Sequence, residues 1–189
     1  MVRVIHLLPP DGLDDGTVRV RGWQADDLDA LVAACQDPEI PRWTRVPSPY
    51  THAIGRDFLT RASDPERLGA DAAVAIVDPA DGTLLGATGI HRVGAPWPDE
   101  DSDLLPDELG YWLAAAARGR GVATRAVRLV CDWAFTVVGR PTLWLQAKVG
   151  NDASVGVAER AGFTYVETRS EIECGATVGD LIVFRRDAP

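Results

Sequence analysis

The stretch that decides the fold is Glu108-Leu-Gly-Tyr-Trp-Leu-Ala-Ala-Ala-Ala-Arg-Gly-Arg-Gly-Val-Ala-Thr124. It predicts a strand, then a tight turn that contains glycine, then the start of a helix. Such a turn presents several unpaired backbone N–H groups to one point, and the helix macrodipole adds partial positive charge there. The stretch therefore predicts an anion site, and a phosphate or pyrophosphate is its natural occupant.

Size and composition predict one globular domain over residues 1–189, with 46% hydrophobic and 25% charged residues. The sequence has no run of about 18 apolar residues, so we expect no membrane partner. The N-terminus is too weakly apolar for a signal peptide, and we expect a cytoplasmic protein. The net charge of −9 argues against nucleic acid as a partner and favours a cationic substrate.

The three cysteines, Cys35, Cys131 and Cys174, are odd in number and far apart in the sequence. Their spacing predicts neither a disulfide framework nor a metal site. Cys35 and Cys131 fall within expected helices, where packing in the core is their expected role.

Hydrophobic periodicity predicts an α+β (mixed α/β) fold around one twisted sheet, with an antiparallel middle. Strands are expected at residues 18–23, 72–77, 83–93, 108–114, 142–149, 163–168 and 180–184. Helices are expected at residues 26–36, 51–62, 121–138 and 151–162. Four prolines at positions 38, 41, 47 and 49 predict a loop between the first two helices.

Apolar residues define the buried face of two of these elements. In the helix at 121–138 the expected inner face is formed by Val122, Ala126, Val130, Ala134 and Val137. In the strand at 142–149 it is formed by Leu143, Leu145, Ala147 and Val149.

Several motifs occur in a definite order along the chain. Arg118-Gly-Arg-Gly-Val-Ala123 fits the pattern Arg/Gln-x-x-Gly-x-Gly/Ala, and it follows Leu85-Gly-Ala-Thr-Gly-Ile-His91 and Glu108-Leu-Gly-Tyr-Trp-Leu113. Asn151-Asp-Ala-Ser154 and Ala158-Glu-Arg-Ala-Gly-Phe163 come after it. Arg19-Val-Arg-Gly-Trp23 and Asp37-Pro-Glu-Ile40 stand near the front. Together these motifs resemble the GNAT acetyltransferases over nearly the whole chain, and most closely the branch that acetylates the N-termini of ribosomal proteins.

This resemblance implies a single GNAT-like domain with a twisted, mostly antiparallel central sheet, splayed central strands and flanking helices. It implies acetyl-CoA as cosubstrate and direct acetyl transfer to a primary amine, either a protein N-terminus or a small molecule. Members of the family frequently form homodimers. A non-catalytic acyl-CoA-binding or sensing module of the same fold is the alternative. An ATP site is disfavoured because no Gly-Lys-Ser/Thr follows the turn.

The resemblance also implies which residues hold acetyl-CoA. Backbone N–H groups would bind the pyrophosphate at Arg118, Gly119, Arg120, Gly121, Val122 and Ala123, and Thr124 could add its hydroxyl. Free backbone groups at Leu113, Ala114 and Ala115 would pair with the pantetheine arm. Asn151 would bond that arm as well, although an N-cap role explains its position equally well.

Acetyl transfer to an amine needs a base, because a lysine-like amine has a pKa near 10.4. Glu108 is the first candidate, since related enzymes often place a glutamate base at the start of this strand, and His91 on the neighbouring strand is the alternative. The resemblance places Ser154 near the CoA sulfur. No tyrosine clearly fits the position of an acid, and Tyr165 lies slightly past the site. A backbone N–H near Leu113 would polarise the carbonyl group.

The acceptor end has weaker signals. An acidic run could draw a cationic amine to the site or could be a solvated loop; it comprises Asp99, Glu100, Asp101, Asp103 and Asp107. Trp43 and Tyr50 could wall an acceptor pocket or simply pack within their loop, and Trp97 could contribute to its mouth.

Overall fold

An eight-stranded sheet runs through the protein, whose computed structural model describes residues 8–9, 11–63, 71–91, 107–173 and 176–189. Neighbouring strands are antiparallel except for β5 and β6, which run parallel. In sheet order the strands are β1 (Leu13–Asp14), β2 (Arg19–Arg21), β3 (Asp71–Val77), β4 (Leu84–His91), β5 (Glu108–Leu113), β6 (Thr142–Lys148), β8 (Ala176–Asp187) and β7 (Thr164–Glu173). The mixed α/β fold with a mostly antiparallel sheet is thus confirmed.

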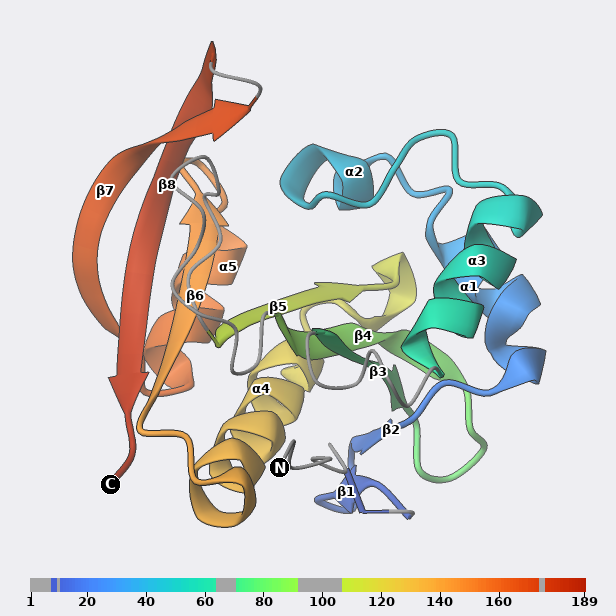
Figure 1. The fold of residues 1–189 in the computed structure, drawn as a ribbon. Helices are drawn as coiled ribbons and strands as arrows, with labels where there is room; N and C mark the ends of the chain where they lie inside the picture. Colours follow the sequence, from blue (N-terminus) through green and yellow to red (C-terminus); the bar gives the residue numbers. More distant parts are fainter. Residues whose placement is uncertain (1–7, 10, 64–70, 92–106, 174–175) are drawn as a thin grey trace, which may run out of the picture.

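Helices cover both faces of the sheet (Figure 1). They are α1 (Leu28–Ala34), α2 (Glu39–Trp43), α3 (His52–Ala62), α4 (Val122–Trp133) and α5 (Asp152–Arg160). One apolar cluster joins the sheet to α4 and α5, and a second joins it to α1 and α3. Alternate residues of β3 divide between them, since Val74 and Ile76 belong to the first cluster and Ala75 and Val77 to the second.

The inner face of α4 is confirmed except at its end. Val122, Ala126, Val130 and Ala134 are buried, whereas Val137 is 71% exposed. The helix continues into a π-helical turn (Ala134–Val138), whose wider i→i+5 spacing turns Val137 away from the sheet. Gly139 then ends the helix with a φ of 76°.

The short helix α2 was not expected, because prolines interrupt that part of the sequence. Pro38 precedes its first residue and Pro41 lies in its first turn, where a helix does not need the backbone N–H that proline lacks. The next helix, α3, begins where predicted, because the Thr51 hydroxyl accepts the N–H of Ile54 at 3.3 Å.

The last strands are longer than the sequence predicts, and β6 is one residue shorter. Val149 is 52% exposed because β6 ends at Lys148 and Gly150 turns the chain with a φ of 89°.

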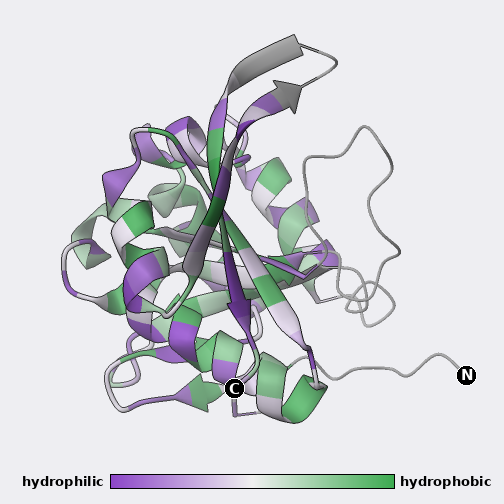
Figure 2. Cartoon of the chain, turned by 90° about the vertical axis from the view of Figure 1, so that its left-hand side faces the viewer, coloured by the Kyte–Doolittle hydropathy of each residue, from purple (hydrophilic) through white to green (hydrophobic). Residues whose placement is uncertain are grey.

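In Figure 2, β7 and β8 cross in front of the rest of the protein and carry both hydrophilic and hydrophobic residues. Charged residues within β7 interrupt the apolar alternation that would have revealed its full length.

No helix within the described parts of the chain is long and apolar enough to cross a membrane.

Candidate active site

A cavity of about 1040 Å³ opens where β5 and β6 separate. The two strands pair only at Glu108 and Trp144 and diverge beyond that point. Residues from both faces of β5 line the cavity, among them Glu108 on one face and Tyr111 on the other. The cavity therefore passes through the sheet, with α4 and α5 on one side and α1 and α3 on the other.

The backbone of β5 presents polar groups to this opening. Residues of an antiparallel pair alternate between groups that face the partner strand and groups that face away. The N–H of Ala114 donates to Leu85 on the β4 side at 2.9 Å, so the backbone groups of Tyr111 and Leu113 face the gap toward β6. The Ala114 carbonyl also has a partner, the N–H of Ala117 at 2.9 Å. The expectation that Ala114 offers free backbone groups is therefore wrong, and neither Ala114 nor Ala115 lines the cavity.

The glycine turn before α4 has the form that an anion site requires. Gly119 and Gly121 have φ values of 72° and 76°, and a Cβ added at either would meet no atom within 4 Å. The N-cap residue of α4, Gly121, has no side chain to cap the helix, so within the described part of the chain the N–H groups of the first turn suit an anionic ligand. Of the predicted pyrophosphate residues, the cavity is lined by Arg118, Gly119, Gly121, Val122, Ala123 and Thr124. The N–H of Arg118 donates to the Ala115 carbonyl at 3.3 Å, so the expectation that this N–H is free for the pyrophosphate is wrong. The exposed Arg120 is not part of that lining.

Glu108, the predicted base, is buried at the start of β5 and faces the cavity. Gln146 on β6 donates from Nε2 to Glu108 Oε2 at 2.5 Å, and Arg169 on β7 donates to Gln146 Oε1 at 2.9 Å. Arg169 thereby fixes which end of the amide faces the carboxylate. Neither partner could be predicted from the sequence, since Gln146 and Arg169 come from distant strands.

His91, the alternative base, lies directly across from Glu108 in the β4–β5 pairing. Its Nε2 atom is 3.1 Å from the position that a Cβ on Gly110 would take, so the imidazole covers Gly110 on the face that carries Glu108. Both candidates line the cavity, and the choice between them stays a prediction.

On the opposite face, two hydroxyl groups meet. The Tyr111 hydroxyl and Ser154 Oγ are 2.8 Å apart. Burial raises the pKa of Tyr111 to about 12, so this phenol is neutral near pH 7. Sequence reasoning found Ser154 but missed Tyr111. Tyr165, by contrast, is 61% exposed and lies outside the lining.

Asn151 caps α5, as one of its two interpretations predicted. Its Oδ1 accepts the N–H of Ser154 at 3.2 Å, which places the serine in the first turn of the helix. Asn151 also lines the cavity, so its amide group remains a candidate for bonding a pantetheine arm.

Trp43 and Tyr50 both line the cavity, and Tyr50 is also buried in the apolar cluster shared with α1 and α3. Their contact with an acceptor stays a prediction. Asp107 does not line the cavity; its carboxylate lies 3.6 Å from Arg140 Nε. The other members of the acidic run and the third aromatic residue fall outside the described residues, namely Trp97, Asp99, Glu100, Asp101 and Asp103.

An ion pair with a buried carboxylate and a partly exposed ammonium group also lines the cavity. Glu171 on β7 is 3% exposed and lies 3.3 Å from Nζ of Lys148, the only lysine of the chain. The sequence did not indicate this pair, because the strand that carries Glu171 was predicted to end earlier.

The described cysteines are unsuited to nucleophilic chemistry. Cys35 and Cys131 are free and buried, and burial raises the pKa of each thiol to about 12. This fits their expected role in packing, while Cys174 lies outside the described residues. Among the residues that can be assessed, no group of three His, Cys, Asp or Glu side chains could hold a metal ion.

Comparison with known proteins gives one family match. Residues 17–164 match the acetyltransferase (GNAT) domain. YdaF from Bacillus subtilis (strain 168), provisionally named a ribosomal N-acetyltransferase, is 34% identical over 83 residues. That match spans 44% of this chain and only 42% of YdaF.

Solved structures share the fold. Spermidine N-acetyltransferase from Vibrio cholerae, in complex with CoA and spermine, has a TM-score of 0.74 at 15% identity, with 92% of this chain and 97% of that one covered. Ribosomal-protein-S5-alanine acetyltransferase from Vibrio fischeri has a TM-score of 0.72 at 16% identity, with 91% and 93% covered.

Proposed function

Because the chain belongs to the acetyltransferase (GNAT) domain family, we propose that it is an acetyl-CoA-dependent N-acetyltransferase that moves the acetyl group directly to a primary amine. The acceptor is a protein N-terminus or a small-molecule amine. The proposal draws support from the Vibrio cholerae relative, whose structure holds CoA and spermine. It draws further support from the ribosomal-protein acetyltransferase with the same fold.

One observation carries the proposal: the cavity passes between β5 and β6, so two substrates can approach each other from opposite faces of the sheet. A carboxylate, Glu108, lies on the face shared with α1 and α3. A hydroxyl pair, Tyr111 and Ser154, lies on the face shared with α4 and α5. This arrangement lets a base act on the amine while a separate hydroxyl group meets the leaving thiolate.

The described residues fit acetyl-CoA at three places. The open glycine turn and the uncapped first turn of α4 suit the diphosphate. The gap-facing backbone groups of Tyr111 and the N–H of Leu113 suit the amides of the pantetheine arm, while the Leu113 carbonyl accepts a hydrogen bond from Arg118. The Tyr111–Ser154 pair suits the sulfur, because hydrogen bonds from hydroxyl groups to a thiolate stabilise the developing charge. When bound, acetyl-CoA supplies the activated acetyl group.

In this proposal Glu108 takes a proton from the acceptor ammonium, so that the nitrogen lone pair can attack the carbonyl carbon. Gln146 holds the carboxylate in position during this step. The new N–C bond forms as the C–S bond breaks, and the Tyr111–Ser154 pair supplies the proton that the departing sulfur takes up. After attack the nitrogen still carries one proton more than the amide needs, and it returns that proton to the pair. Glu108 releases the proton that it took to solvent, so acetyl-CoA and the ammonium group give the amide, free CoA thiol and one proton.

The proposal is tested by measuring free thiol released from acetyl-CoA across a library of N-terminal peptides, polyamines and aminoglycosides. We expect at least one class of amine to support turnover. Glu108→Gln should lower kcat by about 100-fold or more, the scale of general base catalysis, while acetyl-CoA still binds. Glu159→Gln is the matched control, since Glu159 is exposed on α5 and does not line the cavity.

Two outcomes would count against the proposal. Binding of acetyl-CoA without turnover on any amine would favour an acyl-CoA-sensing module. An unchanged rate for Glu108→Gln at saturating acceptor would remove Glu108 as the base and leave His91 as the remaining candidate.

A further inference from the structure

The helix α2 lies above β5 in Figure 1, and its residues Glu39, Ile40 and Trp43 line the cavity. Two contacts at or next to its ends connect it to the proposed cofactor side. Asp37 stands two residues before α2, and Trp43 is the last residue of the helix. Neither contact was foreseen as part of the acetyl-CoA site. Together they connect a wall of the acceptor pocket to the turn that suits a diphosphate.

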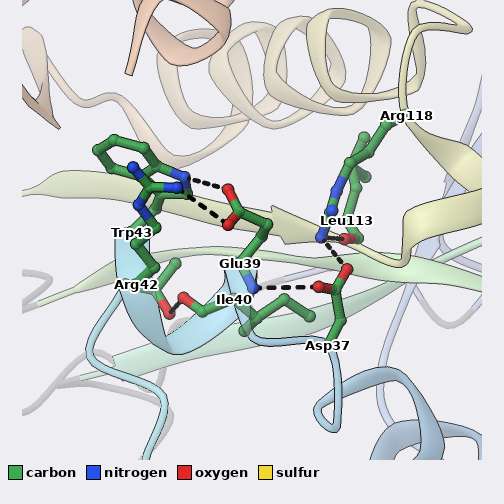
Figure 3. Close-up of polar contacts among 8 residues, drawn as sticks. Asp37, Glu39, Ile40, Arg42, Trp43, Leu113 and Arg118 are labelled. Carbon is green, nitrogen blue, oxygen red and sulfur yellow. Dashed lines mark hydrogen bonds and ion pairs between the residues drawn. The ribbon is translucent and has the colours of Figure 1, made fainter. Parts of the chain in front are cut away.

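Asp37 provides the first contact. Its Oδ2 atom lies 2.7 Å from Arg118 Nη2, and its Oδ1 atom accepts the N–H of Glu39 at 3.0 Å. Figure 3 shows the Asp37 carboxylate between the start of α2 and the Arg118 guanidinium. One carboxylate therefore fixes the N-terminal turn of α2 and also the first residue of the glycine turn.

Arg118 has a second protein partner besides Asp37. The same Nη2 atom donates to the Leu113 carbonyl at 3.0 Å, at the last residue of β5 (Figure 3). The guanidinium thus links the end of β5 to the start of the glycine turn. Both contacts are made by Nη2, so this one atom ties the start of the glycine turn to β5 and to Asp37.

Trp43 provides the second contact. Its indole N–H donates to Glu39 Oε2 at 2.9 Å, and the Arg42 guanidinium lies 4.6 Å from the centre of its ring. The far edge of the ring lies 3.9 Å from the position that a Cβ on Gly150 would take, next to Asn151. The orientation of Trp43 is thus set from within α2, and the ring reaches the β6–α5 connection.

We propose that Asp37 is a positioning residue of the acetyl-CoA site, which acts through Arg118 and links occupancy of the glycine turn to the placement of α2 and Trp43. The inference rests on the proposed function, because it requires the diphosphate of CoA to occupy that turn. By linkage, whatever stabilises the turn stabilises α2, and the reverse. An acceptor that contacts Trp43 would therefore bind better once acetyl-CoA is in place.

The substitution Asp37→Asn separates this role from simple electrostatics. Asparagine keeps an oxygen that can accept the Glu39 N–H, but it removes the charge that holds Arg118. If charge alone mattered, loss of a carboxylate near a diphosphate would tighten CoA binding. If positioning matters, the dissociation constant of CoA rises, by about fivefold for the loss of one charge-assisted contact.

Two further variants complete this comparison of CoA affinities. Asp37→Glu restores a carboxylate and should recover much of the lost affinity, which a change of fold would not. Asp15→Asn is the matched control, since Asp15 forms a 2.8 Å ion pair with Arg125 in α4 and neither residue lines the cavity. It should leave the CoA affinity unchanged.

Hydrogen exchange of the unmodified protein tests the same inference without any variant. Addition of CoA should slow exchange at residues 118–124 and also at residues 38–44, with no change at the β1–β2 hairpin. Protection of the turn without protection of α2, or equal or tighter CoA binding by Asp37→Asn, would overturn the inference and leave the proposed function intact. Failure of the unmodified protein to bind CoA would overturn the proposed function itself.

Discussion

Removal of the Tyr111 hydroxyl tests whether the pair that it forms with Ser154 acts in the reaction. Tyr111→Phe keeps the ring, which packs against the core under α4 and α5, and deletes one hydrogen bond of 2.8 Å. A neutral hydrogen bond contributes a net stability of about 1 kcal/mol, which corresponds to a loss of about 2–4 °C in Tm for a chain of this length.

The expected effect on the rate is larger than that on stability. The phenol can donate to Ser154 Oγ while the serine donates to the leaving sulfur, and that bond strengthens as negative charge develops. Loss of about 1.4 kcal/mol from the transition state lowers kcat about tenfold, while KM for acetyl-CoA changes less than twofold. Thiol release at saturating substrates measures kcat, and thermal unfolding measures the change in Tm.

Ser154→Ala and the double variant complete a cycle. Because the two hydroxyl groups act as a unit, the double variant should be no slower than Ser154→Ala alone. A wild-type kcat in Tyr111→Phe, together with a lowered Tm, would show that the bond serves only the fold. Fully additive losses in the double variant would refute the idea of a joint role.

Two further predictions concern stability. Gly86→Ala should lower the free energy of unfolding by about 3 kcal/mol, because the new Cβ would lie 2.2 Å from the Trp112 carbonyl oxygen. Gly121→Ala should lower it by only about 1 kcal/mol, because its sole cost is a φ of 76°. Chemical denaturation measures both free energies, and equal losses would contradict the assigned causes. The free energy of unfolding should also fall as the pH rises from about 9 toward 12. Burial raises the pKa of Cys131 and Tyr111 to about 12, so the folded state keeps protons that the unfolded state releases at lower pH. Melting curves across this range measure the effect, and a flat profile would contradict it.

The cofactor half of the site could be predicted because its signals are local. A turn with Gly119 and Gly121 at positive φ, followed by an apolar-faced helix, leaves few alternatives to a strand–turn–helix unit. Asn151 likewise predicts the start of α5, because asparagine is a preferred N-cap residue, and the capping bond to Ser154 is present. The sequence therefore located the turn, the helix and Ser154.

The remaining parts depend on contacts between distant segments. Tyr111 and Ser154 are 43 residues apart, and nothing near either one indicates that they meet. Parity along a strand places Glu108 and Tyr111 on opposite faces, so a pattern argument assigns them to different environments. They share one cavity because β5 and β6 separate, and strand separation leaves no mark in the residue pattern.

The short helix α2 illustrates the other kind of error, in which a local signal is real but incomplete. Prolines at positions 38 and 41 discourage a helix in general, yet the first turn of a helix tolerates them. The ion pair of Asp37 with Arg118 then fixes the position of the chain just before α2. The place of the prolines in the first turn and the ion pair of Asp37 with Arg118 are visible only in the structure, so α2 could not be assigned to the site from the sequence.

Calorimetric titration of the unmodified protein with acetyl-CoA and with ATP tests the central claim, a cleft built for acetyl-CoA, most directly. The account predicts saturable binding of one acetyl-CoA per chain, with heat that ATP at the same concentration neither reproduces nor suppresses. Binding of ATP without binding of acetyl-CoA would contradict it, because the glycine turn would then serve a nucleotide and the Tyr111–Ser154 pair would have no sulfur to meet.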